Sequence, residues 1–332
     1  MDRKTLAYVG NPEQLAGIRK VRYEEGAAEG LTAYQVKNGP LQFTVGTDKC
    51  LDLLELSWKG VNLSFLAKNG LSAGAYAGRN AFSDKSVMGG MCFTCGPDNV
   101  GPGDRFRGLP VHGSFRFTPA RQVSSRCFYG PDGQYHMEIS GRMAPAGLFE
   151  PSVTLERTVE TVYGTGTVRI RDCFCNEGYA RAPFLLLYHW NFSGPFLEPG
   201  CRLDIGSRRC VLREEMETPV GPETYLRLEE PEDGGTERVY FHQSEPDESG
   251  WVRLRVENPR LGIRAGLRYA YRYLPRLIQW KSMVSGDYAL GLEPSNCLVF
   301  GRKYEEDHGT LEYLEPGETR TTELEFTVES ME

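Results

Sequence analysis

Residues 288–296 read Tyr-Ala-Leu-Gly-Leu-Glu-Pro-Ser-Asn, and the alternation within them predicts a β-strand. Side chains alternate between the two faces of a strand, so Leu290 and Leu292 would point to one side, and Gly291 and Glu293 to the other. The Glu293 carboxylate therefore shares its face with glycine and alanine, the two smallest residues. This leaves room beside the carboxylate for a ligand. The alternative is a glutamate at the sheet rim that pairs with Arg or Lys, and the spacing alone favours neither.

Pro294 predicts where this strand ends. Proline has no N–H to donate to a β-ladder, so we expect the strand to stop at Glu293 and to leave that side chain at the rim of a sheet. Leu-Glu-Pro also occurs at 197–199 and 314–316, but glycine follows both copies, as is typical of solvated turns. Only the copy at 292–294 ends an apolar run.

The composition indicates a protein of many short strands and turns. The 332 residues include 38 glycines, 20 prolines, 17 tyrosines and 16 phenylalanines, and long amphipathic helical stretches are hard to find. We therefore predict an all-β fold in a single domain, residues 1–332. Residues 1–30 would form an extension with a short helix.

Charge and hydropathy restrict the kinds of partner that the protein is expected to bind. The formal net charge of −7 argues against a nucleic-acid surface, and a small neutral or polar ligand fits better. The N-terminus lacks the apolar core of a signal peptide, and no window approaches about 18 consecutive apolar residues, the length of a membrane span. These features predict a soluble cytoplasmic protein with no membrane partner.

The nine cysteines suit reduced thiols better than a disulfide framework, because their number is odd and they are spread along a long chain. Two close pairs, Cys92 with Cys95 and Cys173 with Cys175, raise the possibility of a zinc site. Neither pair has histidines at ligand spacing, so buried core thiols are the better interpretation and we expect no metal.

Turn residues divide the chain into expected elements. Asn11, followed by proline and then by glutamine three residues after the cap, predicts a short helix to about Lys20. Close spacing of the strands predicts antiparallel hairpins. The expected strands are Thr32–Val36, Leu41–Val45, Leu51–Trp58, Gln134–Gly141, Ser152–Tyr163, Thr165–Cys173, Pro183–Phe192, Trp251–Glu257, Gly262–Tyr269, Arg276–Met283, Tyr288–Glu293 and Thr319–Val328.

Residues 70–112 change character and become rich in glycine. Long stretches without regular structure are uncommon in compact domains and usually build binding sites, so we expect this passage to wrap one mouth of the sheet. Its polar residues include Arg79, Asn99, Asp104 and His112. The glycine spacing does not match a nucleotide-binding fingerprint.

His189 lies in the run 183–192, whose two faces are both apolar. Such a strand is predicted to be central and covered on both sides. Leu185, Leu187 and His189 would share one of these faces. Burying a histidine there costs free energy unless it is hydrogen-bonded. His189 is therefore either a structural residue whose hydrogen bonds are made within the core or a functional residue.

Two stretches depart from this pattern. Arg157 interrupts the otherwise apolar face of the run 152–163. Residues 212–250 are acidic and turn-rich, and we expect a solvated excursion with one hairpin. Asp48, Lys49 and Asp52 suggest a polar cluster, for which turn capping is the favoured role.

Three motifs occur in order along the chain. They are Gly-Gly-Met-Cys-Phe-Thr-Cys-Gly at 89–96 with His112-Gly113 following, Leu-Tyr-His-Trp-Asn-Phe at 187–192, and Leu-Gly-Leu-Glu-Pro at 290–294. In combination they resemble the aldose 1-epimerase, or galactose mutarotase-like, family. The resemblance spans roughly residues 30–328 and is closest to a divergent bacterial branch in which function is largely inferred.

The resemblance implies a large antiparallel β-sandwich with a sugar-binding cleft on one sheet. It matches Glu293 to the catalytic carboxylate, His189 to the catalytic acid and His112 to a substrate-positioning histidine. The family also uses an arginine upstream of the first histidine, for which Arg79 is the nearest candidate in a poorly matching context. A sugar-binding aspartate has no secure counterpart, so hexose preference is open.

Interconverting sugar anomers needs a base at the C1 hydroxyl and an acid at the ring oxygen, and no metal or redox cofactor. In this hypothesis Glu293 is the base and His189 the acid, with different environments setting opposite protonation states. His112, Asn99 and Lys281 would hydrogen-bond sugar hydroxyls. Trp280 would stack on the pyranose or sit in the core. Since Trp280 and Lys281 alternate in direction, at most one faces the cleft.

Two other functions remain open from the sequence. The same carboxylate and histidine would serve a keto-sugar isomerase, epimerase or lyase, which removes a proton from carbon. A non-catalytic carbohydrate-binding protein would keep the fold without turnover, because fold alone does not fix function. The sequence indicates neither the sugar nor whether the protein is a monomer or a homodimer.

Overall fold

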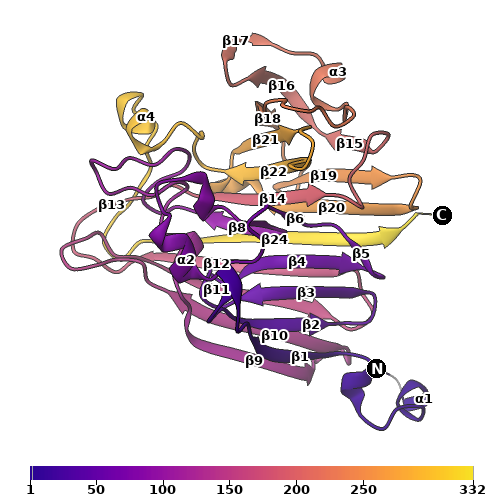
Figure 1. Ribbon diagram of the computed structural model, residues 1–332. Helices are drawn as coiled ribbons and strands as arrows, with labels where there is room; N and C mark the ends of the chain where they lie inside the picture. Colours follow the sequence, from indigo (N-terminus) through magenta and orange to yellow (C-terminus); the bar gives the residue numbers. More distant parts are fainter. Residues whose placement is uncertain (2, 332) are drawn as a thin grey trace.

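Two large antiparallel sheets form most of the computed structural model, which describes residue 1 and residues 3–331 (Figure 1). Their strands lie face to face, with β2–β4 over β10–β12 in Figure 1, and one large apolar core fills the space between them. The predicted all-β sandwich is confirmed.

The first sheet has twelve strands. In spatial order they are β1 (Gly17–Arg22), β2 (Thr32–Lys37), β3 (Leu41–Gly46), β4 (Asp52–Trp58), β8 (Cys92–Cys95), β14 (Leu187–Ser193), β22 (Ala289–Ser295), β21 (Arg276–Ser282), β18 (Arg238–Ser244), β16 (Ser207–Leu212) and β17 (Glu215–Pro219), with β5 (Val61–Asn62) paired to β4.

The second sheet has eight strands, and two short ribbons accompany the sheets. The eight are β15 (Arg202–Ile205), β19 (Trp251–Asn258), β20 (Ile263–Ala270), β24 (Thr319–Ser330), β12 (Thr167–Asn176), β11 (Val153–Val162), β10 (Tyr135–Met143) and β9 (Arg121–Tyr129). The ribbons pair β13 (Ala182–Pro183) with β23 (Tyr313–Leu314) and β6 (Phe65–Leu66) with β7 (Gly89–Gly90).

Helices are few and short. The α-helices are α1 (Arg3–Leu6), α2 (Gly74–Arg79), α3 (Pro222–Tyr225) and α4 (Arg302–Asp307), and the 3₁₀ turns are η1 (Pro12–Gln14), η2 (Gly26–Ala28), η3 (Asp84–Ser86), η4 (Phe115–Phe117) and η5 (Tyr271–Tyr273). Among the residues that the structure describes, none of these helices has the length and apolarity needed to cross a bilayer.

The predicted helix to Lys20 is wrong. The capping box forms as expected, with the Asn11 side chain accepting from the Glu13 N–H and Gln14 reaching back to the Asn11 N–H. It caps only a 3₁₀ turn, because the chain then enters β1 and pairs with β2 along six residue pairs. Pairing with a neighbouring strand overrides the local helix signal.

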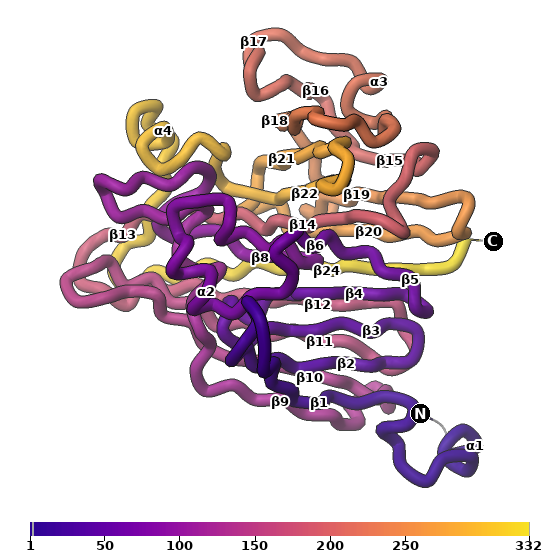
Figure 2. The backbone as a smooth tube through the Cα atoms, viewed as in Figure 1, coloured from indigo at the N-terminus to yellow at the C-terminus, as the bar shows by residue number. Residues whose placement is uncertain are grey.

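Strands occur in the glycine-rich passage, expected to be irregular, and in the acidic stretch, expected to contain one hairpin. The glycine-rich passage 70–112 includes the four-residue strand β8, which pairs with β14 and makes one contact with β4 in the middle of the first sheet. The rest of the passage lies at one end of the molecule beside α4 (Figure 2). The acidic stretch 212–250 includes β17 and β18, which extend the same sheet beyond β21.

The expected end of a strand at Glu293 is also wrong. Strand β22 continues through Pro294 to Ser295, and Glu293 lies near the middle of the sheet, 2% exposed. Proline is tolerated because the ladder between β22 and β14 is interrupted there. Leu187 pairs with Ser295 and Trp190 pairs with Leu292, and the residues between these two pairs are not paired with each other.

Arg157 explains the polar interruption of its strand. Its buried side chain lies between the sheets and uses all five N–H groups, in bonds to both Asp172 oxygens, Asp52 Oδ1, Thr94 Oγ1 and the Cys50 carbonyl. Asp172 also accepts a bond from the Tyr188 hydroxyl. The arginine therefore ties β11 and β12 of one sheet to β4, β8 and β14 of the other.

Replacing Arg157 with methionine should destabilise the protein by about 3–5 kcal/mol, because two buried carboxylates would lose their cation. Urea unfolding measures the change in unfolding free energy. Arg171→Met is the control, since Arg171 is half exposed and its two ion pairs are 3.6 Å long, so about 1 kcal/mol or less is expected. Equal losses in both variants would contradict the role given to Arg157.

Candidate active site

His189 and Glu293 face each other across neighbouring strands. His189 is on β14 and Glu293 on β22, with 3.1 Å between His189 Nε2 and Glu293 Oε1. Both side chains are almost fully buried, at 8% and 2% exposure. The pairing of β14 with β22 places them opposite each other at the interrupted step beside Pro294. Strand register therefore positions this acid–base pair.

Gly291 provides the space beside the carboxylate. It lies on the same face of β22 as Glu293, as the alternation predicts. A Cβ atom there would come 2.5 Å from Glu293 Oε1, 3.0 Å from Trp280 Cβ and 3.3 Å from His189 Cε1. The glycine thus lets the carboxylate, the imidazole and the indole converge on one spot.

Burial pushes both members of the pair toward their neutral forms. Burial raises the pKa of the Glu293 carboxyl well above its ordinary 4.5, and the charge of Glu237 adds to this. Burial also lowers the pKa of His189 to about 3, against an opposing effect of the Asn191 side chain. The two groups thus share one environment instead of the opposite environments expected, and burial favours a shared-proton description in which each group tends to its neutral form.

Three aromatic rings surround His189. Phe93 on β8 stacks on it at 4.4 Å between ring centroids, while Trp280 and His112 each meet it edge-on at 5.7 Å. Trp280 belongs to this face of β21, and its indole N–H donates to Glu237 at 2.8 Å. The rings exclude water from the pair on several sides.

His112 reaches the pair from a loop. Its backbone has φ of 57°, a left-handed conformation that is costly for a residue other than glycine, and Gly113 follows with φ of 79°. Its N–H donates to the Gly101 carbonyl and its own carbonyl accepts from Gly96. These bonds hold the ring next to His189, and burial lowers the pKa of His112 well below 6.5.

The structure brings four of the seven predicted site residues together: Glu293, His189, His112 and Trp280. The other three lie elsewhere. Lys281 points to the opposite face of β21, as alternation requires, and donates to the Thr224 and Arg227 carbonyls and to Glu229. Its buried amine therefore serves the fold.

Asn99 and Arg79 are also separate from the pair. The Asn99 amide donates to the carbonyls of Pro102 and Pro110, and its oxygen accepts from the Arg302 N–H, so it ties loops together. Arg79 ends α2 with an exposed side chain near the Tyr76 ring. Neither has a recorded contact with His189 or Glu293 among the described residues.

Three neighbours of the pair were missed from sequence. Asn191 follows His189 by two residues, a spacing that could have revealed it. It donates to the carbonyls of Gly90 and His189. Phe93 lies in a strand too short to recognise. Glu237 gave no signal, because it sits in a stretch that resembles a solvated acidic loop.

No group of three or more His, Cys, Asp or Glu residues with metal-binding geometry occurs in residues 3–331. The cysteines of the two close pairs are free, with Cys92 and Cys95 buried and Cys173 and Cys175 partly exposed. Cys95 lies on the same face of β8 as Phe93, and burial raises its pKa well above 9.

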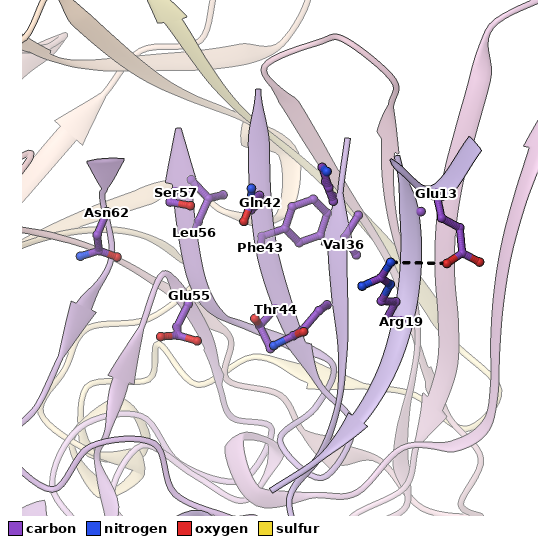
Figure 3. A pocket seen from close by; sticks show the side chains of 13 residues that line it. Glu13, Arg19, Val36, Gln42, Phe43, Thr44, Glu55, Leu56, Ser57 and Asn62 are labelled. Atoms are coloured by element: carbon purple, nitrogen blue, oxygen red, sulfur yellow. Dashed lines mark ion pairs between the residues drawn. The ribbon is translucent and has the colours of Figure 1, made fainter. Parts of the chain in front are cut away.

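A larger hollow of about 460 Å³ lies on the outer face of β1–β4 (Figure 3). Polar side chains such as Gln42, Thr44 and Glu55 stand on its floor, and the Glu13–Arg19 ion pair lies at one edge. Neither His189 nor Glu293 lines it. We place the candidate active site at the buried pair, because His189 and Glu293 are facing groups that can exchange protons.

Solved structures share this architecture. A proposed aldose 1-epimerase from Klebsiella pneumoniae is 20% identical, with a TM-score of 0.85 over 96% of this chain and 86% of that one. A galactose mutarotase-like protein from Clostridium acetobutylicum is 14% identical, with a TM-score of 0.68 over 96% and 100%. Galactose 1-epimerase from Lactobacillus acidophilus is 12% identical, with a TM-score of 0.63 over 96% and 100%. The protein thus has the galactose mutarotase-like fold.

A match to a family model assigns the chain to a family. The model described as domain of unknown function DUF4432 matches residues 28–328, and the chain belongs to that family. A search of curated proteins finds no match. The resemblance inferred from the three motifs is therefore confirmed at the level of the fold, and the family itself is the one of unknown function.

The His189 imidazole should stay neutral far below pH 6.5, because charging it in this buried site is unfavourable. A pH titration of the ¹⁵N imidazole shifts by NMR measures this directly. His136 is the internal control. Burial lowers its pKa, but bonds to Glu160 and Asp132 outweigh this and raise it above 6.5. Titration of His189 near pH 6.5 would contradict the shared-proton description.

Proposed function

We propose that the protein is a carbohydrate mutarotase, which interconverts the anomers of a free or modified sugar. The observation that carries this proposal is the buried pair of His189 and Glu293, whose facing atoms lie 3.1 Å apart on a sheet face lined by aromatic rings. His189 Nδ1 and Glu293 Oε1 are buried and have no hydrogen-bond partner among the described residues. Buried polar atoms without partners are uncommon and are often satisfied by a ligand.

The reaction needs a proton removed from one oxygen and added to another. Glu293 takes the proton of the C1 hydroxyl while His189 gives a proton to the ring oxygen, and the ring opens. The C1 aldehyde then rotates about the C1–C2 bond, and the reverse steps close the ring on the other face. Each positioned acid or base contributes on the order of 10²–10⁴-fold to such a step.

The shared proton makes this exchange self-contained. The neutral pair carries its proton on Glu293, and moving that proton across the 3.1 Å gap gives a carboxylate and an imidazolium. These are the forms that act as base and acid. Sugar hydroxyls that bind both groups would favour this ion pair, because they replace the hydrogen bonds that burial has removed.

The walls of the site suit a sugar ring. Trp280 offers an indole whose N–H is fixed by Glu237, and aromatic rings pack well against the apolar face of a pyranose. His112 lies next to His189 and is held by loop backbone bonds, so it would donate or accept at one hydroxyl. The structural relatives named as epimerases and mutarotases support the same class of substrate.

Exchange spectroscopy by NMR tests the proposal. With a panel of aldoses, the parent should accelerate α/β exchange over buffer, while His189→Ala and Glu293→Gln should each lose about 10²–10⁴-fold. His136→Ala and Glu55→Gln are matched controls and should retain the parent rate, since they remove the same groups away from the pair.

The same samples in deuterated water separate mutarotation from carbon-acid chemistry. Mutarotation leaves hydrogen on carbon untouched, whereas an isomerase or a carbon epimerase would introduce deuterium there. Deuterium on carbon that appears only with the parent would replace the proposed reaction by one of those. Absence of accelerated exchange for every sugar tried would refute the mutarotase assignment.

The acid limb of the kcat/KM pH profile should lie toward pH 3 and not near pH 6.5. The active pair holds one proton. As the pH falls, a second proton adds to His189, whose pKa is lowered to about 3. As the pH rises, the proton leaves Glu293, whose pKa is raised above 4.5. Activity measured against buffer blanks should therefore fall only toward pH 3 on the acid side. A loss of activity as the pH falls through 6.5 would contradict this.

A further inference from the structure

Lys49 is a buried cation without a partner. It lies in the turn between β3 and β4 and is 3% exposed. Its carbonyl accepts from the Asp52 N–H, but its amine makes no hydrogen bond or ion pair with any residue the structure describes. The next two residues, Cys50 and Leu51, both have left-handed backbones, with φ of 59° and 53°. Strained backbone of this kind persists only where the surrounding structure enforces it. An unpaired buried amine is costly, so this position calls for a ligand.

Arg116 is a second buried cation close to Lys49. It is 3% exposed and donates to the Val111 carbonyl and to the Ser86 carbonyl and hydroxyl, none of which carries a charge. Two of its five N–H groups remain free. Burial and the Arg116 charge together lower the pKa of Lys49 to about 8, against the opposing charges of Asp48 and Asp52.

The nearby carboxylates are bound elsewhere. Asp48 accepts from the Gly74 N–H, and Asp52 binds Arg157 and Thr94. No carboxylate oxygen of the described residues comes within 4.0 Å of the Lys49 or Arg116 nitrogens. The two cations thus lack a direct counter-ion inside the protein.

Both cations line a cleft that adjoins the acid. The cleft is small, with a volume of about 10 Å³, roughly the space that one water or one anion oxygen needs. Its other lining residues are Ser86, Val87, Met88, Gly89 and Phe93. Phe93 connects the cleft to the active site, because its ring stacks on His189 at 4.4 Å. Along the sheet the order is Phe93, His189, Glu293, so the cationic cleft lies on the side of the acid and away from the base.

The bonding within a pyranose shows which carbon of the substrate would lie on the His189 side of the site. The acid delivers its proton to the ring oxygen, and the ring oxygen is bonded to C5, which carries C6. A group on C6 therefore projects past the acid, on the side opposite to C1 and the base.

We propose that the substrate is an aldopyranose with an anionic group on C6, and that Lys49 and Arg116 bind this group. The inference rests on the proposed mutarotase function, since it uses His189 to orient the ring. A carboxylate, a phosphate and a sulfonate share the required chemistry, namely two or three oxygens that accept charged hydrogen bonds.

Kinetics on sugars that differ only at C6 test the inference. The probes are glucose, glucuronate, glucose 6-phosphate and 6-deoxy-6-sulfoglucose, each followed by NMR exchange. The parent should show a KM at least tenfold lower for one of the three anions than for glucose, and that anion identifies the substrate class.

Lys49→Met should raise the KM of the preferred anionic sugar about 10- to 100-fold, as expected for losing a hydrogen bond to a charged group. It should leave kcat and the glucose KM unchanged. Methionine keeps the volume of the side chain and replaces a buried charge by an apolar group, which folded proteins often tolerate. Lys85→Met is the matched control, because it removes the same charge from an exposed position in η3 and should leave the preference intact.

A measurement on the parent alone guards against a misfolded variant. Inorganic phosphate and sulfate should compete with the preferred anionic sugar and raise its apparent KM. Equal KM values for all four sugars, absence of this competition, or a preference that survives Lys49→Met would each overturn the inference while leaving the mutarotase assignment intact.

If no sugar exchanges faster than in buffer, the mutarotase assignment fails, and calorimetric titration of the same four sugars decides the binding question. Tighter binding of an anionic sugar that is lost in Lys49→Met would uphold the anion site. Binding that is equal for charged and neutral sugars, or undetectable for all, would reject it.

Discussion

The ion cluster around Arg157 is the constraint on which the site depends. It joins the two sheets with charged hydrogen bonds in a buried setting, where such bonds are strong only if every donor and acceptor is satisfied. Its partners in the first sheet directly neighbour the functional residues in sequence. Thr94 follows Phe93, and Tyr188 precedes His189. Because neighbouring residues on a strand point to opposite faces, anchoring one residue below the sheet fixes the other above it.

The same cluster reaches the cationic cleft. Arg157 donates to the carbonyl of Cys50 and binds Asp52, and both residues follow Lys49 at the strained turn. The turn is held from beneath, so its lysine stays buried without a partner of its own. One arginine between the sheets thus bonds, directly or through a shared carboxylate, to residues that adjoin His189, Phe93 and Lys49 in sequence.

The sequence predicted the fold well and the site in part. Alternation in long strands such as 153–162 and 319–330 located the sheets, and the motifs identified Glu293, His189 and His112. Local patterns failed where pairing decides the outcome. Gly17–Arg22 became a strand beside β2, and β8 was too short to stand out among glycines. Asn99 and Lys281 were assigned to the site by residue type, but their polar atoms are occupied by loop carbonyls that no linear pattern reveals. The Lys49 amine lacks such partners among the described residues, and no linear pattern reveals that either.

Pro294 lies in a site that is built from two kinds of element, central strands and loops. His189 and Glu293 lie beside it on two central strands, whereas His112 and several residues around the cationic cleft come from loops and turns. Loops accept insertion and substitution far more readily than central strands do. The central strands can therefore stay unchanged during evolution while substitutions in the loops change which ligands the site accepts.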